Sequence, residues 1–360
     1  MRRIQVLITS LFAFVLTATA CGSTTGDASP DAVVDDAEDG GAEADLDAAA
    51  SLRLALTNSA ATESYVITAS QETLLDVPAL GPRQLSEHDP DHPATITTVT
   101  PDGVHVFMDL YGVFGGMLPA GETVVVETWS LPEEVIVDTT TYQVLLDLNP
   151  SAPLGPFRPG VSRVDLARVG TEGSSLVEAI AGAQPPSLSD LAAALVAGLD
   201  GVQSSSDRRF TGTMSHAAFL ESMGGDLETL ARSTASGLAL GFGFDVDTLT
   251  DFYVEVFRAV TAEVVITLSE VGLLEEVHVV SDLSVLYERL PAEIESLMAG
   301  QPTPAEVAEV ERLFADAVFT MDQIVQFDLT PGIRLPDAPA LTEDRTDEWI
   351  EFMVANGFVN

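Results

Sequence analysis

Metal binding is the first chemistry that residue types in this sequence suggest. His88-Asp89-Pro90-Asp91-His92 places two imidazoles and two carboxylates within five residues, and both groups can bind zinc. Pro82 and Pro93 flank the stretch, which favours a solvated turn between strands over a metal site. Asp245 and Asp247 lack the glycine and the distant glutamate of a calcium-binding loop. We therefore expect no bound metal and no cofactor.

No catalytic signature is present in the sequence. It contains no Gly-x-Ser-x-Gly elbow, no His-Glu-x-x-His, no P-loop and no Gly-x-Gly-x-x-Gly that opens a helix. His105, His216 and His278 stand singly in strand-like or helix-like segments, as surface or hydrogen-bonded histidines do. Pairs of carboxylates arise by chance among 56 acidic residues. The sequence thus predicts that the protein is not an enzyme.

The charge of the chain excludes another class of partner. The chain contains 56 acidic residues and 15 basic residues, the basic ones all arginine, and its formal net charge is −41. Nucleic acids and anionic headgroups bind to positively charged surfaces, so we expect neither as a partner of this acidic body. Because Cys21 is the one cysteine, the chain forms no internal disulfide.

Residues 1–21 have the features of an export signal. Two arginines precede the apolar run Ile4–Leu16, which is shorter than the about 20 residues of a membrane-spanning helix. Small residues then lead to Cys21, and this order resembles the lipobox of bacterial lipoproteins, although Ala18 stands where that motif prefers leucine. The resemblance implies a signal peptide over 1–20, a lipidated Cys21, and an exported protein anchored in the cell membrane on its extracytoplasmic side. The alternative is an ordinary secretory signal that leaves a free thiol.

Composition divides the rest of the chain. Residues 21–45 have almost no large apolar side chains and predict a disordered acidic tether. Residues 46–342 form the predicted folded domain, which opens with a short helix over 46–58. Residues 343–360 contain a predicted C-terminal helix from Thr346 to Asn356.

Alternating apolar and polar residues predict strands before Leu148 and after Ala262. The first group includes a strand through Tyr142–Leu148. Short turns join the strands, so we expect antiparallel pairing, with early strands paired to late ones. Helical spacing predicts helices over 164–183, 187–199, 219–239, 249–260 and 305–317, with a short strand over 209–214. Ser187-x-x-Asp190 is an N-terminal capping signal for the second of these helices.

This order of elements resembles the actinobacterial lipoproteins of the LppX and LprG type and the related lipoprotein carrier LolA. Local patterns contribute to the resemblance, namely Val137-Asp138-x-x-x-Tyr142 and Phe210-x-Gly212. It covers most of residues 46–340 and contains no catalytic motif. It implies an α+β fold in which helices cover the concave face of a curved antiparallel β-sheet, a half-barrel. It also implies binding or shuttling of a lipid, or another hydrophobic small molecule, at the cell envelope.

The inward-facing strand positions are the candidate ligand-binding residues, and two phenylalanines of a Gly-Phe repeat are added as a mobile apolar edge. These candidates are Tyr65, Ile67, Val106, Met108, Val124, Val126, Tyr142, Val144, Phe242, Phe244, Val264, Ile266, Val277, Val279, Val325 and Phe327. A filled core would use the same residues, so a structural or adhesive surface lipoprotein without a cavity is the alternative. A transporter solute-binding lipoprotein fits less well, because consecutive early strands lack intervening helices.

Overall fold

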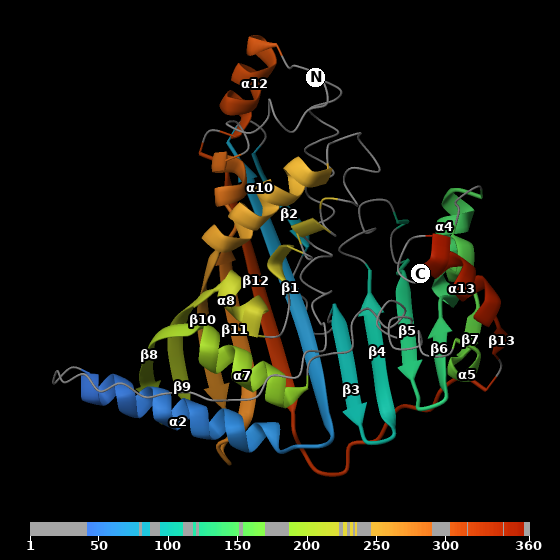
Figure 1. Cartoon of the computed structure of the whole chain (residues 1–360), viewed down its shortest axis with the longest axis horizontal. Helices are drawn as coiled ribbons and strands as arrows, with labels where there is room; N and C mark the ends of the chain where they lie inside the picture. The colour runs from blue at the N-terminus through green and yellow to red at the C-terminus, as the bar shows by residue number, and fades with distance from the viewer. Residues whose placement is uncertain are drawn as a thin grey trace. The chain divides into compact units, whose positions relative to one another are not determined.

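The computed structural model describes residues 42–78, 81–86, 94–110, 118–119, 122–150, 154–169, 187–222, 226–228, 231–232, 235, 246–289, 303–314, 316–340 and 342–355 (Figure 1). Its contacts divide the chain into two compact units. Unit 1 contains the described residues of Met1–Ala61, Gln71–Glu87 and Pro186–Ile324. Unit 2 contains those of Thr62–Ser70, His88–Pro185 and Val325–Asn360. Both units therefore combine segments that are far apart in sequence.

The strands form one open sheet with the order β13-β7-β6-β5-β4-β3-β1-β12-β11-β10-β9-β8, and β2 pairs with β1 outside this path. Together with the helices, this sheet makes the chain an α+β protein, as predicted. The strands are β1 (Tyr65–Val77), β2 (Gly81–Ser86), β3 (Thr95–Thr100), β4 (Gly103–Asp109), β5 (Val125–Ser130), β6 (Glu134–Asp138), β7 (Val161–Asp165), β8 (Leu199–Ser206), β9 (Arg209–Ser215), β10 (Thr261–Leu268), β11 (Leu274–Asp282), β12 (Val318–Asp328) and β13 (Glu343–Asp344).

Strand pairing agrees with the sequence in most places. The pairs from β3 to β7 and from β8 to β11 are antiparallel, as the short connections predict. The short strand β13 instead runs parallel to β7, so the sheet is mixed rather than wholly antiparallel. β1 neighbours β12 in the strand order, which confirms the prediction that early strands pair with late ones across the helical middle.

Unit 1 packs helices against strands. Among the described residues, its helices include α2 (Ala42–Ala60), α7 (Leu188–Gly198), α8 (His216–Ser222), α10 (Val246–Ala259) and α12 (Pro304–Phe314). The predicted cap of α7 is present, because the Ser187 hydroxyl accepts a hydrogen bond from the Asp190 N–H at 3.1 Å. The largest core cluster joins α10, through Tyr253 and Phe257, to Phe319 and Met321 of β12. Burial of this apolar side of α10 holds the helix in place.

Unit 2 has its own core at the C-terminal helix. Trp349 of α13 (Thr346–Ala355) is 1% exposed and packs with Val135 and Val137 of β6 and with Val164 of β7. Phe157 also contacts this cluster, with its ring centroid 4.8 Å from that of Trp349. The other helical elements of unit 2 are η2 (Thr140–Tyr142), α4 (Gln143–Leu148), η3 (Gly155–Phe157) and α5 (Leu166–Val169). The predicted C-terminal helix is confirmed, and it completes the core of unit 2.

The predicted strand through Tyr142–Leu148 is wrong, because the segment forms η2 and α4. The Asp138 carboxylate accepts a hydrogen bond from the Thr140 N–H at 2.8 Å and starts a turn at the end of β6. A short apolar run of this length fits a helix as well as a strand. Val164 lies in β7 rather than in a helix, and β8 was not predicted.

The remaining boundaries differ by a few residues. Helix α2 begins at Ala42, four residues before the predicted start of the folded domain at residue 46. β12 begins at Val318, earlier than its predicted inward positions Val325 and Phe327 suggested. None of the helices among the described residues has both the length and the hydrophobicity of a membrane span.

Candidate ligand pocket

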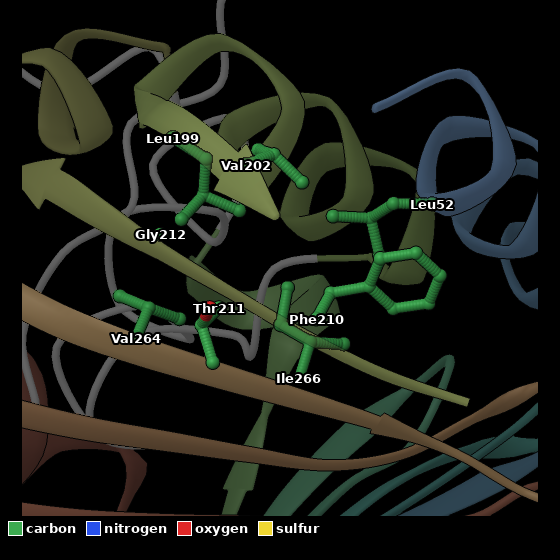
Figure 2. A pocket seen from close by; sticks show the side chains of 8 residues that line it. All are labelled: Leu52, Leu199, Val202, Phe210, Thr211, Gly212, Val264 and Ile266. Carbon is green, nitrogen blue, oxygen red and sulfur yellow. The ribbon is translucent and has the colours of Figure 1, made fainter. Parts of the chain in front are cut away.

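A small apolar pocket lies over the β9 and β10 strands of unit 1 (Figure 2). Its floor includes Phe210 and Gly212 of β9 and Val264 and Ile266 of β10. Strand register explains why these residues meet, since Gly212 pairs with Val264 and Phe210 with Ile266. Side chains of directly paired residues point to the same face of a sheet. The sequence alternation of both strands thus builds the floor.

Helix α2 and strand β8 supply the other side of the pocket. Leu52 comes from α2, and Leu199 and Val202 come from β8. The C-terminal end of α2 is fixed to β11, because the Leu274 N–H donates to the Ser59 hydroxyl at 2.7 Å. Leu52 lies two turns before this attachment and is 3% exposed. The pocket therefore lies under the helix that follows the predicted tether.

A bulge in β8 and a glycine in β9 allow the strands to approach closely here. The register between β8 and β9 shifts between Asp200 and Gln203, where Gly201 has a φ of +62°, a left-handed value that favours glycine. A Cβ atom on Gly212 would lie 3.0 Å from the Asp200 carbonyl oxygen and 3.2 Å from Leu199 Cδ2. A larger residue at position 212 would push β8 away from the floor.

The chemistry and size of the pocket define what it can hold. Thr211 is the one polar residue of the eight that line it, and none of the eight has an ionisable side chain. The space between these side chains amounts to about 140 Å³ including open solvent, but none of it admits a water-sized sphere. Sites for small-molecule ligands usually measure about 300–1,000 Å³. The pocket is therefore apolar and, in this conformation, too small for a lipid chain.

The predicted site residues of unit 1 share one face of the sheet. Val264 and Ile266 line the pocket and are each 1% exposed. Val279 and Val277 lie opposite them on β11 as their register partners. Val277 is buried, whereas Val279 is half-buried. The two β11 valines thus extend the same apolar face without lining the pocket.

The predicted residues of unit 2 occupy a second stretch of apolar sheet face. Register links Ile67 of β1 through Thr97 of β3 to Val106 of β4, and it links Met108 of β4 to Val126 of β5. Tyr65 lies two residues before Ile67, on the same side of β1. Tyr65 and Val106 are buried, and the other three predicted residues are half-buried. Val126 packs against the cluster around Trp349.

The other predicted residues have different environments. Val124 is fully buried just before β5, Val325 is half-buried and Phe327 is buried on β12. Tyr142 lies on η2 rather than on the sheet, and burial raises the pKa of its hydroxyl to about 12. Val144 is half-buried on α4. Phe242, Phe244 and Cys21 lie outside the described residues.

The histidines serve local structure. His105 is buried, with Nε2 3.0 Å from a Glu127 carboxylate oxygen and its ring centroid 4.7 Å from that of Trp129. His278 Nε2 lies 2.7 Å from Asp322 Oδ1. Burial lowers the pKa of His216. No metal-binding group of three or more side chains occurs within the described residues, and the 88–92 stretch lies outside them.

Sequence reasoning missed most of the pocket lining. Phe210, Thr211 and Gly212 lie in a strand that was predicted, and its pairing with β10 was the signal that could have added them. Leu199 and Val202 belong to the unpredicted strand β8. Nothing local to Leu52 indicates which strands its helix covers.

Comparison with protein-family models gives no match for this sequence, and comparison with curated proteins gives none either. The resemblance to the LppX, LprG and LolA lipoproteins therefore rests on the element order and the short patterns described above, and the function that it implies is a proposal.

Proposed function

We propose that the protein is an exported lipoprotein, anchored through Cys21, that binds a lipid or another hydrophobic molecule at the cell envelope. Helices cover the concave face of its curved sheet, and the ligand binds between them and the strands. The pocket under α2 carries this proposal, because it is apolar, free of ionisable groups, and bounded by a helix rather than by a second sheet. A helix at the edge of a pocket, such as α2, can move as a rigid body while the strands keep their pairing.

Ligand entry requires α2 to move away from the sheet. The helix contacts α7, β8 and β11, and its residues Leu52, Ala55 and Leu56 are buried. Its attachment at Ser59 lies near its end, so the rest of the helix can tilt while that hydrogen bond is kept. Tilting would enlarge the pocket above Ile266 and Gly212.

The small volume of the pocket favours one competing function. Because no water-sized sphere fits in the pocket, the described part of the site is packed like a filled core. A filled core is expected of the structural or adhesive surface lipoprotein that the sequence left as the alternative. The two functions differ in whether the purified protein contains an extractable hydrophobic molecule.

Mass spectrometry after organic extraction of the purified protein tests the proposal. The wild-type protein should release a hydrophobic molecule. In Ile266→Asp, a site that opens can hydrate the new carboxylate, so the variant should keep its circular dichroism spectrum and lose the molecule. In a filled core, an unpaired buried carboxylate costs several kcal/mol and should unfold the protein.

Glu263→Ala is the matched control, because Glu263 is exposed on the opposite side of the same strand. It should retain both the fold and the bound molecule. Glu127 is unsuitable as a control, since its carboxylate pairs with His105. A wild-type protein without an extractable molecule, together with an unfolded Ile266→Asp, would refute ligand binding and support the structural alternative.

A further inference from the structure

Two large apolar side chains of unit 1 face solvent. Val271 is 80% exposed and Leu54 is 64% exposed, more than any other large apolar side chain among the described residues. Val271 lies in the turn between β10 and β11, and Leu54 lies on α2. Single exposed apolar residues are common on protein surfaces, so their meaning depends on whether they lie together.

Backbone contacts place the two side chains at the same end of unit 1. The Leu274 N–H, at the start of β11, donates to the Ser59 hydroxyl of α2 at 2.7 Å. Val271 comes shortly before Leu274 in the chain. Leu54 comes before Ser59 by about 7.5 Å along the helix axis. The C-terminal half of α2 therefore lies beside the β10–β11 turn (Figure 1).

The β10–β11 turn presents Val271 at its tip. The Gly272 N–H donates to the Ser269 carbonyl oxygen at 3.0 Å and closes a tight turn. Gly272 has a φ of +78°, and a Cβ atom on it would meet nothing within 4 Å. The tip of the hairpin is thus open to solvent, and its short turn holds Val271 in place.

Exposed arginines lie at the same end. The Leu268 N–H of β10 donates to the Arg208 carbonyl oxygen at 2.8 Å, and Leu268 pairs with Leu274. These contacts place the β8–β9 turn, with Arg208 and Arg209, beside the β10–β11 turn. Arg53 is exposed on α2. Within the described part of the chain, no carboxylate forms an ion pair with any of the three arginines.

The charge of this end differs from that of the whole chain. The two turns and the start of β11 also contain three exposed acids, Asp207, Glu270 and Glu275. Together with the three arginines they make this end close to neutral, in a chain of net charge −41. Salt screens more distant carboxylates beyond about 8 Å at physiological ionic strength. A phospholipid interface offers phosphates to the arginines and an acyl-chain boundary to the apolar side chains.

We propose that this end of unit 1, formed by α2, the β8–β9 turn and the β10–β11 turn, binds the interface of a phospholipid bilayer. Val271 and Leu54 enter the acyl-chain boundary, and the arginines contact phosphates. This inference rests on the membrane anchor of the proposed function. A flexible chain as long as the stretch from Cys21 to Ala42 spans on the order of 25 Å, so the anchor keeps α2 within reach of the bilayer.

Binding of this end to a bilayer also brings the pocket close to lipid. Leu52 and Phe210 line the pocket and are the chain neighbours of Arg53 and Arg209 (Figure 2). A hydrophobic molecule can then pass between bilayer and pocket over a short distance. Two apolar side chains bind a bilayer only weakly and reversibly, so the lipid anchor remains the main attachment.

A fluorescent label on the hairpin tip tests the proposal. The chain without its proposed signal peptide, residues 21–360, contains no cysteine once it carries Cys21→Ser. Val271→Cys then adds a single thiol for an environment-sensitive nitrobenzoxadiazole label. On addition of phosphatidylcholine vesicles, the emission of this label should shift to shorter wavelength and gain intensity, because the label enters the bilayer.

Val318→Cys, labelled in the same way, is the matched control. Val318 is 46% exposed and belongs to the same unit. The N–H of Leu283, which follows β11, donates to the Phe319 carbonyl oxygen at 2.8 Å. Val318 therefore lies at the end of β11 opposite the β10–β11 turn. Its label should keep the same emission when vesicles are added.

A second substitution tests whether α2 belongs to the same surface. In the labelled Val271→Cys protein, Leu54→Asp should raise the lipid concentration for half-maximal signal about tenfold, because an apolar side chain no longer enters the bilayer. Leu148→Asp replaces an exposed leucine of unit 2 and should leave this concentration unchanged.

Three results would each overturn the proposal. They are an unchanged emission of the Val271→Cys label, an equal shift of the Val318→Cys label, and an unchanged lipid concentration in Leu54→Asp. None of them bears on the hydrophobic molecule extracted from the purified protein, so ligand binding would still stand. Absence of that molecule would refute ligand binding and leave the membrane surface of unit 1 to be judged by the vesicle measurements.

Discussion

Replacement of Arg345 by methionine should loosen the C-terminal segment of unit 2. The Arg345 side chain is 4% exposed. It donates to the Glu343 carboxylate and to the Arg158 carbonyl oxygen, both at 2.9 Å. It also reaches the Pro156 carbonyl oxygen at 3.3 Å. Arg345→Met keeps the volume of the side-chain stem and removes every one of these bonds.

The expected loss follows from the two short bonds. A hydrogen bond from a charged donor to the buried carbonyl contributes roughly 1.5–3 kcal/mol. The Glu343 side chain is 55% exposed, so its ion pair is screened by solvent and adds little to this value. The longer contact from Arg345 to the Pro156 carbonyl oxygen has weaker geometry and adds little to the stability. Arg345→Met should therefore destabilise unit 2 by roughly 1.5–3 kcal/mol.

Tryptophan fluorescence during urea unfolding measures this change. Both tryptophans of the chain, Trp129 and Trp349, belong to unit 2. The backbone N–H of Trp349 donates to the backbone carbonyl oxygen of Arg345 at 3.0 Å. The fluorescence therefore reports the unit that the substitution affects. Arg334→Met removes an exposed arginine of the same unit and should shift the unfolding free energy by less than about 0.5 kcal/mol. If Arg345→Met shifted it equally little, the buried guanidinium would not hold the segment and the reasoning would fail.

Three further predictions concern the anchor, the acid response and the core. Cys21→Ser should move the protein from the membrane fraction to the soluble fraction, and continued sedimentation with membranes would disprove lipidation. The Arg345 hydrogen bond lowers the pKa of Glu343 below its ordinary 4.5, and the Thr346 hydroxyl lowers that of Asp344 below 3.8. The unfolded chain therefore takes up these protons first, so the stability that the two groups contribute is complete above about pH 5 and declines as the pH falls through their folded pKa values. An acid titration of tryptophan fluorescence should show this decline, and Glu343→Gln should reduce it. Tyr253→Phe should leave the melting temperature unchanged or raise it, because the buried Tyr253 hydroxyl has no hydrogen-bond partner in the described part of the chain. A fall of several degrees in the melting temperature would contradict this prediction.

The sequence predictions that are confirmed rest on local patterns. Side chains alternate with a period of two along a strand, so Val264 and Ile266 could be assigned to one face before their partners were known. The Ser187 cap and the start of the C-terminal helix at Thr346 are equally local signals. The same method failed at Tyr142–Leu148, because the Asp138 turn directs a short apolar run into helix.

Within a strand, the sequence alone is enough to assign the residues that face the core, because the backbone geometry of a strand repeats over two residues. Which distant segments meet depends on the tertiary structure. Leu52 covers Phe210, and Gln323 bonds to Gln71 across 252 positions of the chain. These contacts depend on strand order, on register and on the close approach of β8 to Gly212. Each of these comes from packing between elements, and no periodicity within one element encodes it.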